Sequence, residues 1–381
     1  MYLRTITPVV EDMRKYFPII GITGPRQSGK TTLAKVLFKH LPYVSLENLD
    51  TRTRALDDPR AFLAGYPQGA IFDEIQHVPA LFSYLQEIVD NTPEKGLYVF
   101  AGSQNFTLNQ HITQSLSGRI GMVTLLPLSL SELGMPLNNW DIIFKGGYPG
   151  LHHLQINPLY FYPSYVQTYL ERDVRQLKNT GNYTLFQKFL KLCAGRIGQI
   201  VNFSALAQDA GIAHTTARHW LHTLQARYVV FNLPPYYKNF NKRVIKMSKL
   251  YFYDTGLACA LLGIENMHQL DTHYMRGALL ENLVILELLK QRFNQGLRNH
   301  LYFWRDRTGH EVDLLIERGE SLCAIEIKAS MTLKKDFVKG LQYFCKLTQA
   351  AQGYLVYQGT QTGSYKDIGL VPIQQLHSLG L

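Results

Sequence analysis

The chain has 381 residues, of which 46% are hydrophobic and 18% are charged, a composition that indicates folded domains and excludes an intrinsically disordered protein. No apolar run is long enough to span a bilayer, the first residues lack the apolar stretch of a signal peptide, and the four cysteines show no metal-type pairing. We therefore expect two or three domains of a cytoplasmic protein that contacts no membrane.

The net charge of +10 is concentrated in one short segment. Residues 183–250 contain ten Lys and Arg against one Asp, whereas residues 1–182 and 251–381 are close to neutral. Such a concentration is typical of a surface that binds the phosphate backbone of a nucleic acid. We predict DNA as the partner, with RNA second. A basic module that docks on an acidic protein is the alternative.

The first third of the chain alternates short apolar runs with helical patterns. Apolar runs that read as strands cover 18–23, 70–73 and 97–101. Helical patterns cover 30–40 and 80–91. Buried strands that alternate with helices predict an α/β fold, in which a parallel sheet has helices on both faces.

The first of these strands runs directly into a phosphate-binding motif. Residues 24–31 match G-x-x-x-x-G-K-[ST] in full, between a strand and a helix as the motif requires. Backbone N–H groups would face the phosphates of ATP, Lys30 would reach the β and γ phosphates, and the Thr31 hydroxyl would ligate Mg2+. The predicted nucleotide-binding residues are Gly24, Pro25, Arg26, Gln27, Ser28, Gly29, Lys30, Thr31 and Thr32.

Acidic and polar side chains follow the next two strands. Asp73 would hold Mg2+ through water, and Glu74 would polarise the attacking water, because phosphoryl transfer depends on positioning and charge neutralisation. An exposed strand end is the alternative for this pair. Ser103 or Gln104 would sense the γ-phosphate or orient water, although an ordinary polar turn explains them equally well.

Two arginines are candidates for stabilising charge in the transition state. Arg119 or Arg172 would act within the same chain or from a neighbouring subunit, and the second case would require a homo-oligomer. Because arginines are common on protein surfaces, neither position proves such a role.

Several of these stretches together resemble a known family, the prokaryotic AAA-type ATPases with a C-terminal domain of restriction-endonuclease-like fold. The stretches are Gly24–Thr31, Phe72–Gln76, Ala101–Ser103, Ser117–Arg119, Leu126–Ser129 with Glu132, and Gly146–Pro149. The resemblance implies an ATPase domain, a winged helix and a nuclease-like domain, in that order. We place them at residues 1–182, 183–250 and 251–381, with a hinge at Gly146–Gly150. The family resemblance implies the domain architecture of the chain more directly than its biological role.

The basic segment has the pattern of two helices joined by a glycine turn. The helices cover 203–210 and 214–227, which is typical of a helix-turn-helix. On the second helix an apolar face leaves Arg218 and His219 outward, as candidates for groove or phosphate contacts. A basic wing would follow, with Lys238, Lys242, Arg243, Lys246 and Lys249. A winged helix used only for protein contacts is the alternative.

A set of acids and a lysine follows near the C-terminus. Two consecutive strand patterns cover 311–316 and 324–328, and Glu326 and Lys328 alternate with isoleucines on the second. With Asp313 and with Glu281 on a preceding helix, the set resembles the PD-(D/E)xK nuclease superfamily. The resemblance implies that Glu281, Asp313 and Glu326 bind Mg2+ and that Lys328 orients or activates water.

These patterns lead to one main hypothesis, an ATP-hydrolysing ATPase that acts on DNA and carries a metal-dependent nuclease domain. A regulatory switch with a catalytically silent nuclease-like domain is one alternative. A remodeller of a protein partner is the other.

Overall fold

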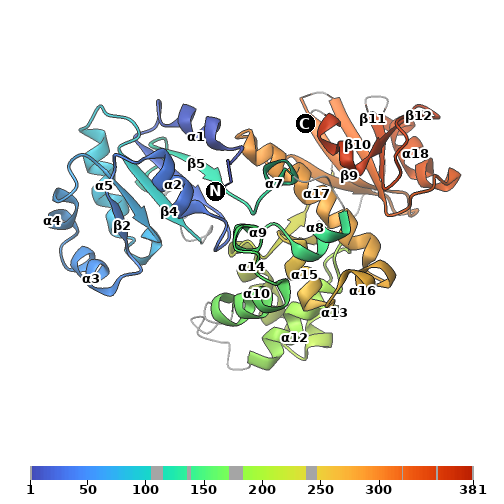
Figure 1. Cartoon of the computed structure of the whole chain (residues 1–381), viewed down its shortest axis with the longest axis horizontal. Coiled ribbons are helices and arrows are strands. Elements are labelled where there is room, and N and C mark those ends of the chain that lie inside the picture. Colours follow the sequence, from blue (N-terminus) through green and yellow to red (C-terminus); the bar gives the residue numbers. More distant parts are fainter. Residues whose placement is uncertain are drawn as a thin grey trace.

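A computed structural model describes residues 2–103, 115–134, 139–170, 183–236, 247–319, 321–348 and 351–379. The chain passes through an α/β region (blue to cyan in Figure 1), a helical region (green to yellow) and a C-terminal sheet (orange to red). No described helix combines the length and the apolar character needed to cross a membrane.

The first region is built on a parallel sheet with the strand order β2-β3-β4-β1-β5. Its strands are β1 (Ile19–Thr23), β2 (Tyr43–Ser45), β3 (Ala70–Asp73), β4 (Tyr98–Gly102) and β5 (Ile120–Thr124). The register pairs Thr23 with Gly102 and Asp73 with Ala101. The carboxyl ends of β1, β3 and β4 therefore meet at one edge of the sheet, as the sequence predicts.

Helices cover both faces of this sheet, which confirms the predicted α/β layers. The helices are α1 (Thr7–Met13), α2 (Lys30–Leu37), α3 (Leu49–Asp57), α4 (Pro59–Ala64) and α5 (Leu81–Asp90). Side chains of β1 alternate between two cores: Ile19 packs in the core with α3, α4 and α5, whereas Ile20 and Ile22 pack with α1 and α2. Both faces are apolar because each has its own layer of helices.

The middle of the chain is mostly helical. It comprises α7 (Leu130–Leu133), α8 (Asn139–Lys145), α9 (Pro149–His153), α10 (Pro158–Tyr165), α12 (Tyr183–Ala194), α13 (Phe203–Ala210), α14 (His214–Ala226), β6 (Val230–Leu233), β7 (Lys249–Phe252), α15 (Thr255–Leu261) and α16 (Met267–Thr272). The bounds of α13 and α14 confirm the two predicted helices to within one residue. Gly211 joins them with φ +76°, a left-handed conformation that glycine adopts without steric cost.

One apolar core joins the helical region to the C-terminal sheet. Trp220 of α14 packs edge-to-face on Phe186 and Phe189 of α12. The same core continues through β7 and α15 to α17 (Arg276–Asn294) and to Ile325. The two regions therefore share their interior, which runs without a break across Leu250.

The C-terminal sheet is mixed and has the order β12-β13-β11-β10-β9-β8. Its elements are β8 (Leu301–Arg305), β9 (Glu311–Arg318), β10 (Ser321–Lys328), α18 (Lys339–Thr348), β11 (Ala351–Tyr357), β12 (Gly363–Tyr365) and β13 (Ile368–Pro372). Helix α17 lies over one face and α18 over the other, each with its own core. Strands β9 and β10 are antiparallel, and Leu314 pairs with Ile325. This register brings Asp313 beside the end of β10, as predicted.

Candidate functional site

The P-loop lies at the carboxyl edge of the first sheet, between β1 and α2. Gly24 has φ +146°, and a Cβ atom there would lie 2.1 Å from the carbonyl oxygen of Leu125. Gly29 has φ +96°, which also favours glycine. Both glycines of the motif are therefore required by the path of the backbone, independently of any ligand.

Lys30 is folded back onto the loop. Its side chain is buried, and Nζ donates hydrogen bonds to the carbonyl oxygens of Gly24 (3.0 Å) and Pro25 (2.7 Å). Burial lowers the pKa of Lys30 to about 8, although Glu74 and Asp73 oppose the shift. The hydroxyl of Ser28 is also buried and has no hydrogen-bond partner among the described residues. A cation and an unused donor thus face the loop, and an anion would satisfy both.

Thr31 and Asp73 lie side by side, as a shared magnesium site requires. The Thr31 Oγ1 donates a hydrogen bond to Asp73 Oδ2 at 2.9 Å. Tyr43 of β2 donates a second one at 2.8 Å, and sequence reasoning missed this tyrosine. Burial raises the pKa of Tyr43 to about 12, with a further contribution from Asp73. The oxygen donors of Thr31 and Asp73 suit a hard divalent cation such as Mg2+.

Glu74 is held in a left-handed backbone conformation, with φ +55°. Its N–H donates to the carbonyl oxygen of Ala101 at 2.8 Å, and its Oε2 accepts a hydrogen bond from Ser103 Oγ at 3.1 Å. Gln76 donates to the same carboxylate oxygen, which sequence reasoning did not foresee. The structure thus brings Ser103 to Glu74, whereas Gln104 lies outside the described residues.

Two adjoining cavities surround this set of side chains. One of about 380 Å³ is lined by the P-loop, Asp73, Glu74 and Pro149. The other, of about 350 Å³, is lined mainly by apolar side chains, among them Leu33, Leu128 and Leu154. Gly29, Thr32 and Pro149 border both cavities.

Arg4 ties the P-loop to the segment after β5, a contact with no signal in the sequence. Its guanidinium donates to the carbonyl oxygens of Ser28 (2.7 Å) and Leu126 (2.7 Å) and forms an ion pair with Glu132 at 3.0 Å. The conformation of the loop therefore depends on residues more than 100 positions away.

The structure corrects the proposed role of Arg119 within its own chain. Arg119 immediately precedes β5, and its carbonyl accepts a hydrogen bond from the N–H of Ile19 at the start of β1. It lies at the amino edge of the sheet, opposite the P-loop, and its side chain pairs with Asp90 at 2.9 Å. A contribution from a neighbouring subunit stays a prediction. Arg172 lies outside the described residues.

The acids predicted near the C-terminus come together at one half-buried site. Lys328 Nζ lies 2.5 Å from Glu326 Oε1 and 3.6 Å from Asp313 Oδ2. Asp313 Oδ2 also accepts a hydrogen bond from the N–H of Ile327 at 2.9 Å. Glu281 projects from α17 and accepts a hydrogen bond from Tyr251 at 2.5 Å.

Lys249 also enters this acidic spot, which corrects its prediction as part of an exposed basic wing. Its side chain is buried, its Nζ lies 3.5 Å from Glu281 Oε1, and it forms an ion pair with Glu311. Burial alone would lower its pKa, but Glu281, Asp313 and Glu311 outweigh that effect and raise it. We call Lys249, Glu281, Glu311, Asp313, Glu326 and Lys328 the carboxylate–lysine cluster.

Two acids of this cluster, Glu281 and Glu326, hold their protons more tightly than ordinary carboxyl groups. Burial and the charge of Asp313 raise the pKa of Glu281 to about 7 and that of Glu326 to about 8. Glu326 Oε2 is buried and has no hydrogen-bond partner within the described part of the chain. These oxygens are of the type that Mg2+ prefers. No three described Asp, Glu, His or Cys side chains, however, are grouped closely enough to hold a metal ion.

The predicted nucleic-acid contacts are only partly described. Arg218 and His219 are exposed on α14, as predicted, and the Arg218 guanidinium lies over the ring of Phe203, 5.6 Å from its centroid. Lys242 and Arg243 lie outside the described residues, together with Lys238 and Lys246.

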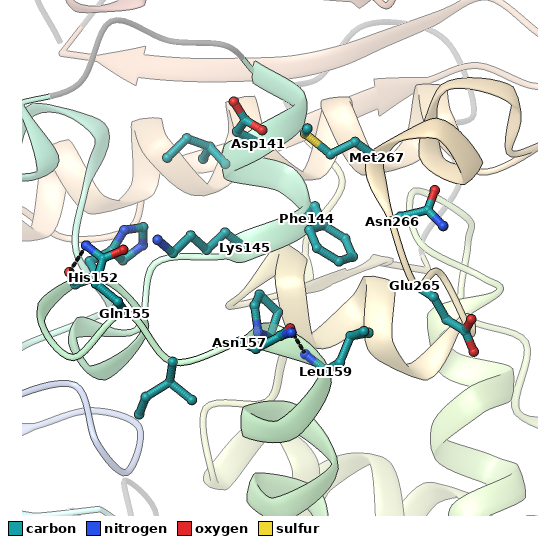
Figure 2. Close-up of a pocket in the computed structure, with 13 residues that line it drawn as sticks. Asp141, Phe144, Lys145, His152, Gln155, Asn157, Leu159, Glu265, Asn266 and Met267 are labelled. Atoms are coloured by element: carbon teal, nitrogen blue, oxygen red, sulfur yellow. Dashed lines mark hydrogen bonds between the residues drawn. The ribbon is translucent and has the colours of Figure 1, made fainter.

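A further cavity, which no sequence motif indicated, lies in the helical region. It measures about 560 Å³ and lies between α8, the start of α10 and the loop before α16. Figure 2 shows Lys145 extending toward His152 and the Asn157 side chain capping α10 through the N–H of Leu159, at 3.0 Å. The cavity has apolar walls and a mixed-charge rim that includes Asp141 and Glu265.

The turn at residues 146–150, predicted as a hinge, is held by hydrogen bonds, and Gly146, Gly147 and Tyr148 in it are buried. The Gly147 N–H donates to Asp254 Oδ2 at 2.8 Å, and His152 Nε2 lies 2.8 Å from the carbonyl oxygen of Gly146. Gly146 has φ +71°, and a Cβ atom on it would meet the Tyr162 hydroxyl at 2.1 Å. Gly146 and Gly147 are needed here because the neighbouring atoms leave no room for a side chain.

Comparisons with known proteins agree with the interpretation of the P-loop region as an ATPase domain. Residues 16–134 match the model of an AAA domain, residues 137–268 match a domain of unknown function (DUF8612), and residues 276–376 match another (DUF4143). The first region is therefore an AAA-type P-loop ATPase domain.

Among solved structures, the Walker-type ATPase PABY2304 of Pyrococcus abyssi has 13% identity and a TM-score of 0.46, and it covers 67% of this chain and 94% of its own. AMPPCP-bound DnaA from Aquifex aeolicus has 15% identity and a TM-score of 0.31, covering 58% and 85%.

Curated relatives match over almost the whole chain. The uncharacterized proteins Rv2008c of Mycobacterium tuberculosis and Mb2031c of Mycobacterium bovis are each 30% identical over 368 residues, which is 95% of this chain and 82% of theirs. This extent of similarity includes the ATPase domain and both regions of unknown function. The chain belongs to the family of these mycobacterial proteins.

Proposed function

We propose that the protein binds ATP with Mg2+ at the P-loop and hydrolyses it. The observation that carries the proposal is the contact of Thr31 with Asp73 beside the buried Lys30, with Glu74 in the same cavity. Lys30 would leave the carbonyl oxygens of Gly24 and Pro25 to contact the phosphates. Thr31 and Asp73 would hold Mg2+, which neutralises charge on the phosphates. Glu74 would orient the attacking water, while Ser103 fixes its carboxylate.

The base of the nucleotide would occupy the second, apolar cavity. That cavity adjoins the phosphate site at Gly29, Thr32 and Pro149 and has a volume of about 350 Å³. Apolar walls beside polar phosphate contacts are usual in nucleotide sites, because a flat base gains from burial.

Turnover by a Glu74→Gln variant tests the proposed hydrolysis. We expect this protein to bind Mg-ATP as tightly as the unmodified protein and to hydrolyse it about 100-fold more slowly or worse, because the amide cannot accept a proton from water. Binding would be measured by calorimetry and turnover by phosphate release. Glu94→Gln, at an exposed acid outside both cavities, is the matched control. Normal turnover by Glu74→Gln would remove this glutamate from its proposed role.

We further propose that α13 and α14 form a winged-helix module that contacts duplex DNA. The support is the net charge of +9 in residues 183–250 and the exposure of Arg218 and His219 on α14. Phosphate contacts release counterions, so affinity should fall steeply with salt. RNA is the second ligand to test, and ATP turnover with each nucleic acid would show whether hydrolysis responds to it.

An Arg218→Ala variant tests this module. We expect weaker DNA binding and a slope of log affinity against log salt that is shallower by about 1, because one phosphate contact is lost. Fluorescence anisotropy of a labelled duplex at several salt concentrations would measure it. Arg298→Ala removes an exposed arginine beyond the helical region and should leave the slope unchanged. Salt-insensitive binding by the unmodified protein would reject the DNA proposal and favour a protein partner.

For the carboxylate–lysine cluster we propose a metal-dependent nuclease site. Support comes from the close approach of Lys328 to Asp313 and Glu326 and from the unpartnered Glu326 Oε2. Asp313 and Glu326 would hold Mg2+, for which one or two carboxylates are enough, and the bound ion would polarise a phosphodiester. Lys328 would orient water.

A silent domain within a nucleotide-dependent switch is the second candidate. It is favoured by the burial of Lys249 in the cluster, because that ammonium already supplies a cation to Glu281 and Glu311.

A further inference from the structure

Tyr228 connects the end of α14 to the root of the P-loop. Its hydroxyl donates a hydrogen bond to Thr23 Oγ1 at 2.9 Å, and Thr23 Oγ1 donates in turn to the carbonyl oxygen of Val123 at 3.2 Å. Thr23 is the last residue of β1 and immediately precedes Gly24. Both side chains are almost fully buried, at 2% and 1% exposure. The bond therefore joins two regions far apart in sequence without access to solvent.

The position of Tyr228 is fixed from its other side as well. Its backbone has φ +56°, which is unusual for a bulky residue and persists only where surrounding contacts impose it. Its ring packs edge-on against Tyr253, with centroids 5.5 Å apart, and the Tyr253 N–H donates to the carbonyl oxygen of Val229 at 3.0 Å. A shift of α14 would consequently be transmitted to the hydroxyl of Tyr228.

The turn with Gly147 and Pro149, which borders the nucleotide cavity on the side opposite the P-loop, is attached to the residue next to Tyr253. Asp254, next to Tyr253, accepts hydrogen bonds from the Gly147 N–H (2.8 Å) and the Tyr162 hydroxyl (2.6 Å). Gly147 lies in the turn that places Pro149 at the border of both cavities. The P-loop and the facing turn are thus both anchored beside the end of α14.

We infer that Tyr228 is a positioning residue that couples nucleotide occupancy of the P-loop to the conformation of α14. This inference rests on the proposed binding of ATP. When phosphates draw Lys30 away from the carbonyl oxygens of Gly24 and Pro25, the root of the loop at Thr23 must readjust, and its bond to Tyr228 carries the change to α14. The coupling is reciprocal, so a ligand on the exposed face of α14 changes nucleotide affinity by the same factor.

Hydrogen exchange with and without a nonhydrolysable Mg-ATP analogue tests the inference in the full chain. In the unmodified protein, the analogue should change the exchange rates of α14 amides by about threefold or more. In Tyr228→Phe the analogue should still bind, with an affinity within about twofold, but the change in α14 should fall to less than about half. Tyr253→Phe removes the neighbouring hydroxyl but keeps the ring that packs on Tyr228, and it is the matched control.

A second variant, at the acceptor of the Tyr228 hydrogen bond, tests the same contact from the side of the P-loop. Thr23→Val removes the acceptor next to the P-loop but leaves the Thr124 hydroxyl, which also interacts with Tyr228. It should therefore reduce the α14 response in the same direction as Tyr228→Phe, and the double variant should behave like Tyr228→Phe alone. An unchanged α14 response in a folded Tyr228→Phe or Thr23→Val protein would overturn the inference. So would an absent response in the unmodified protein when calorimetry shows that the analogue binds. Absence of binding itself would instead reject the proposed ATP site.

Discussion

A Lys30→Ala variant is expected to lose nucleotide binding. In the proposed complex the Lys30 ammonium contacts two phosphates, and hydrogen bonds to charged groups are each worth about 1.5–3 kcal/mol. Their loss should weaken Mg-ATP binding by about 100-fold or more, since 1.4 kcal/mol corresponds to a factor of ten. Calorimetric titration of the folded protein with Mg-ATP would measure the effect. The loop itself should persist, because its shape is fixed by Gly24, Gly29 and the contacts of Arg4.

Lys39→Ala is the matched control for this experiment. Lys39 is exposed just beyond the end of α2 and borders neither cavity, so its removal should leave the affinity unchanged. Retained binding in Lys30→Ala would mean that the nucleotide is held elsewhere. If the unmodified protein took up no Mg-ATP either, the proposed ATPase function would fail as a whole.

The same lysine predicts how nucleotide affinity depends on pH. The pKa of Lys30 is lowered to about 8, because burial disfavours its charged form. Bound phosphates favour the charged form and would raise this pKa. Binding therefore takes up a proton above pH 8, and affinity should fall as pH rises through that range, by up to about tenfold per unit. Calorimetry in buffers of different ionisation enthalpy would detect the proton uptake.

An Asp313→Ala variant is expected to abolish metal-dependent nicking of plasmid DNA. Asp313 lies between Lys328 and the backbone of β10, so its loss would remove a proposed metal ligand together with a contact that positions Lys328. Rates should fall by about 1,000-fold, as for other groups that act directly on a developing charge. Lys328→Ala should have an effect of the same order, and chelation of divalent ions should stop the reaction in every variant.

Asp336→Ala provides the control for nicking. Asp336 lies in the same region, and its exposed carboxylate pairs with Lys339 at 2.6 Å, outside the carboxylate–lysine cluster. Nicking that is equal in Asp313→Ala, Lys328→Ala and the unmodified protein would indicate a contaminating nuclease. Absence of nicking in the unmodified protein, in spite of DNA binding, would support the alternative of a silent domain that serves a nucleotide-dependent switch.

The parts that sequence predicts well are those determined by neighbours along the chain. The P-loop, the strand ending at Asp73 and the turn between α13 and α14 each have local signals, namely glycines at left-handed positions and apolar runs of the right period. Asp313 and Glu326 were also placed correctly, because two consecutive strands pair directly.

The errors and omissions concern contacts that depend on the three-dimensional fold. The run of basic residues predicts that Lys249 belongs to the basic wing, yet β7 places it among the acids of α17 and β9. Tyr43 and Arg4 reach their partners only after distant strands pair. The error at Arg119 was avoidable: a residue that precedes an apolar run lies at the amino edge of a parallel sheet, away from the phosphates.

The apolar interior that runs across Leu250 has a consequence for dissecting the protein. A fragment that started at Tyr251 would cut β7 after Leu250, remove the partner strand β6 that pairs with Tyr251 and Phe252, and discard the part of the shared apolar core that precedes residue 251. Such a fragment would aggregate more readily than the intact chain, since large exposed apolar faces self-associate. The described residues from α8 to the strands of the C-terminal sheet therefore share one apolar core and should be expressed together.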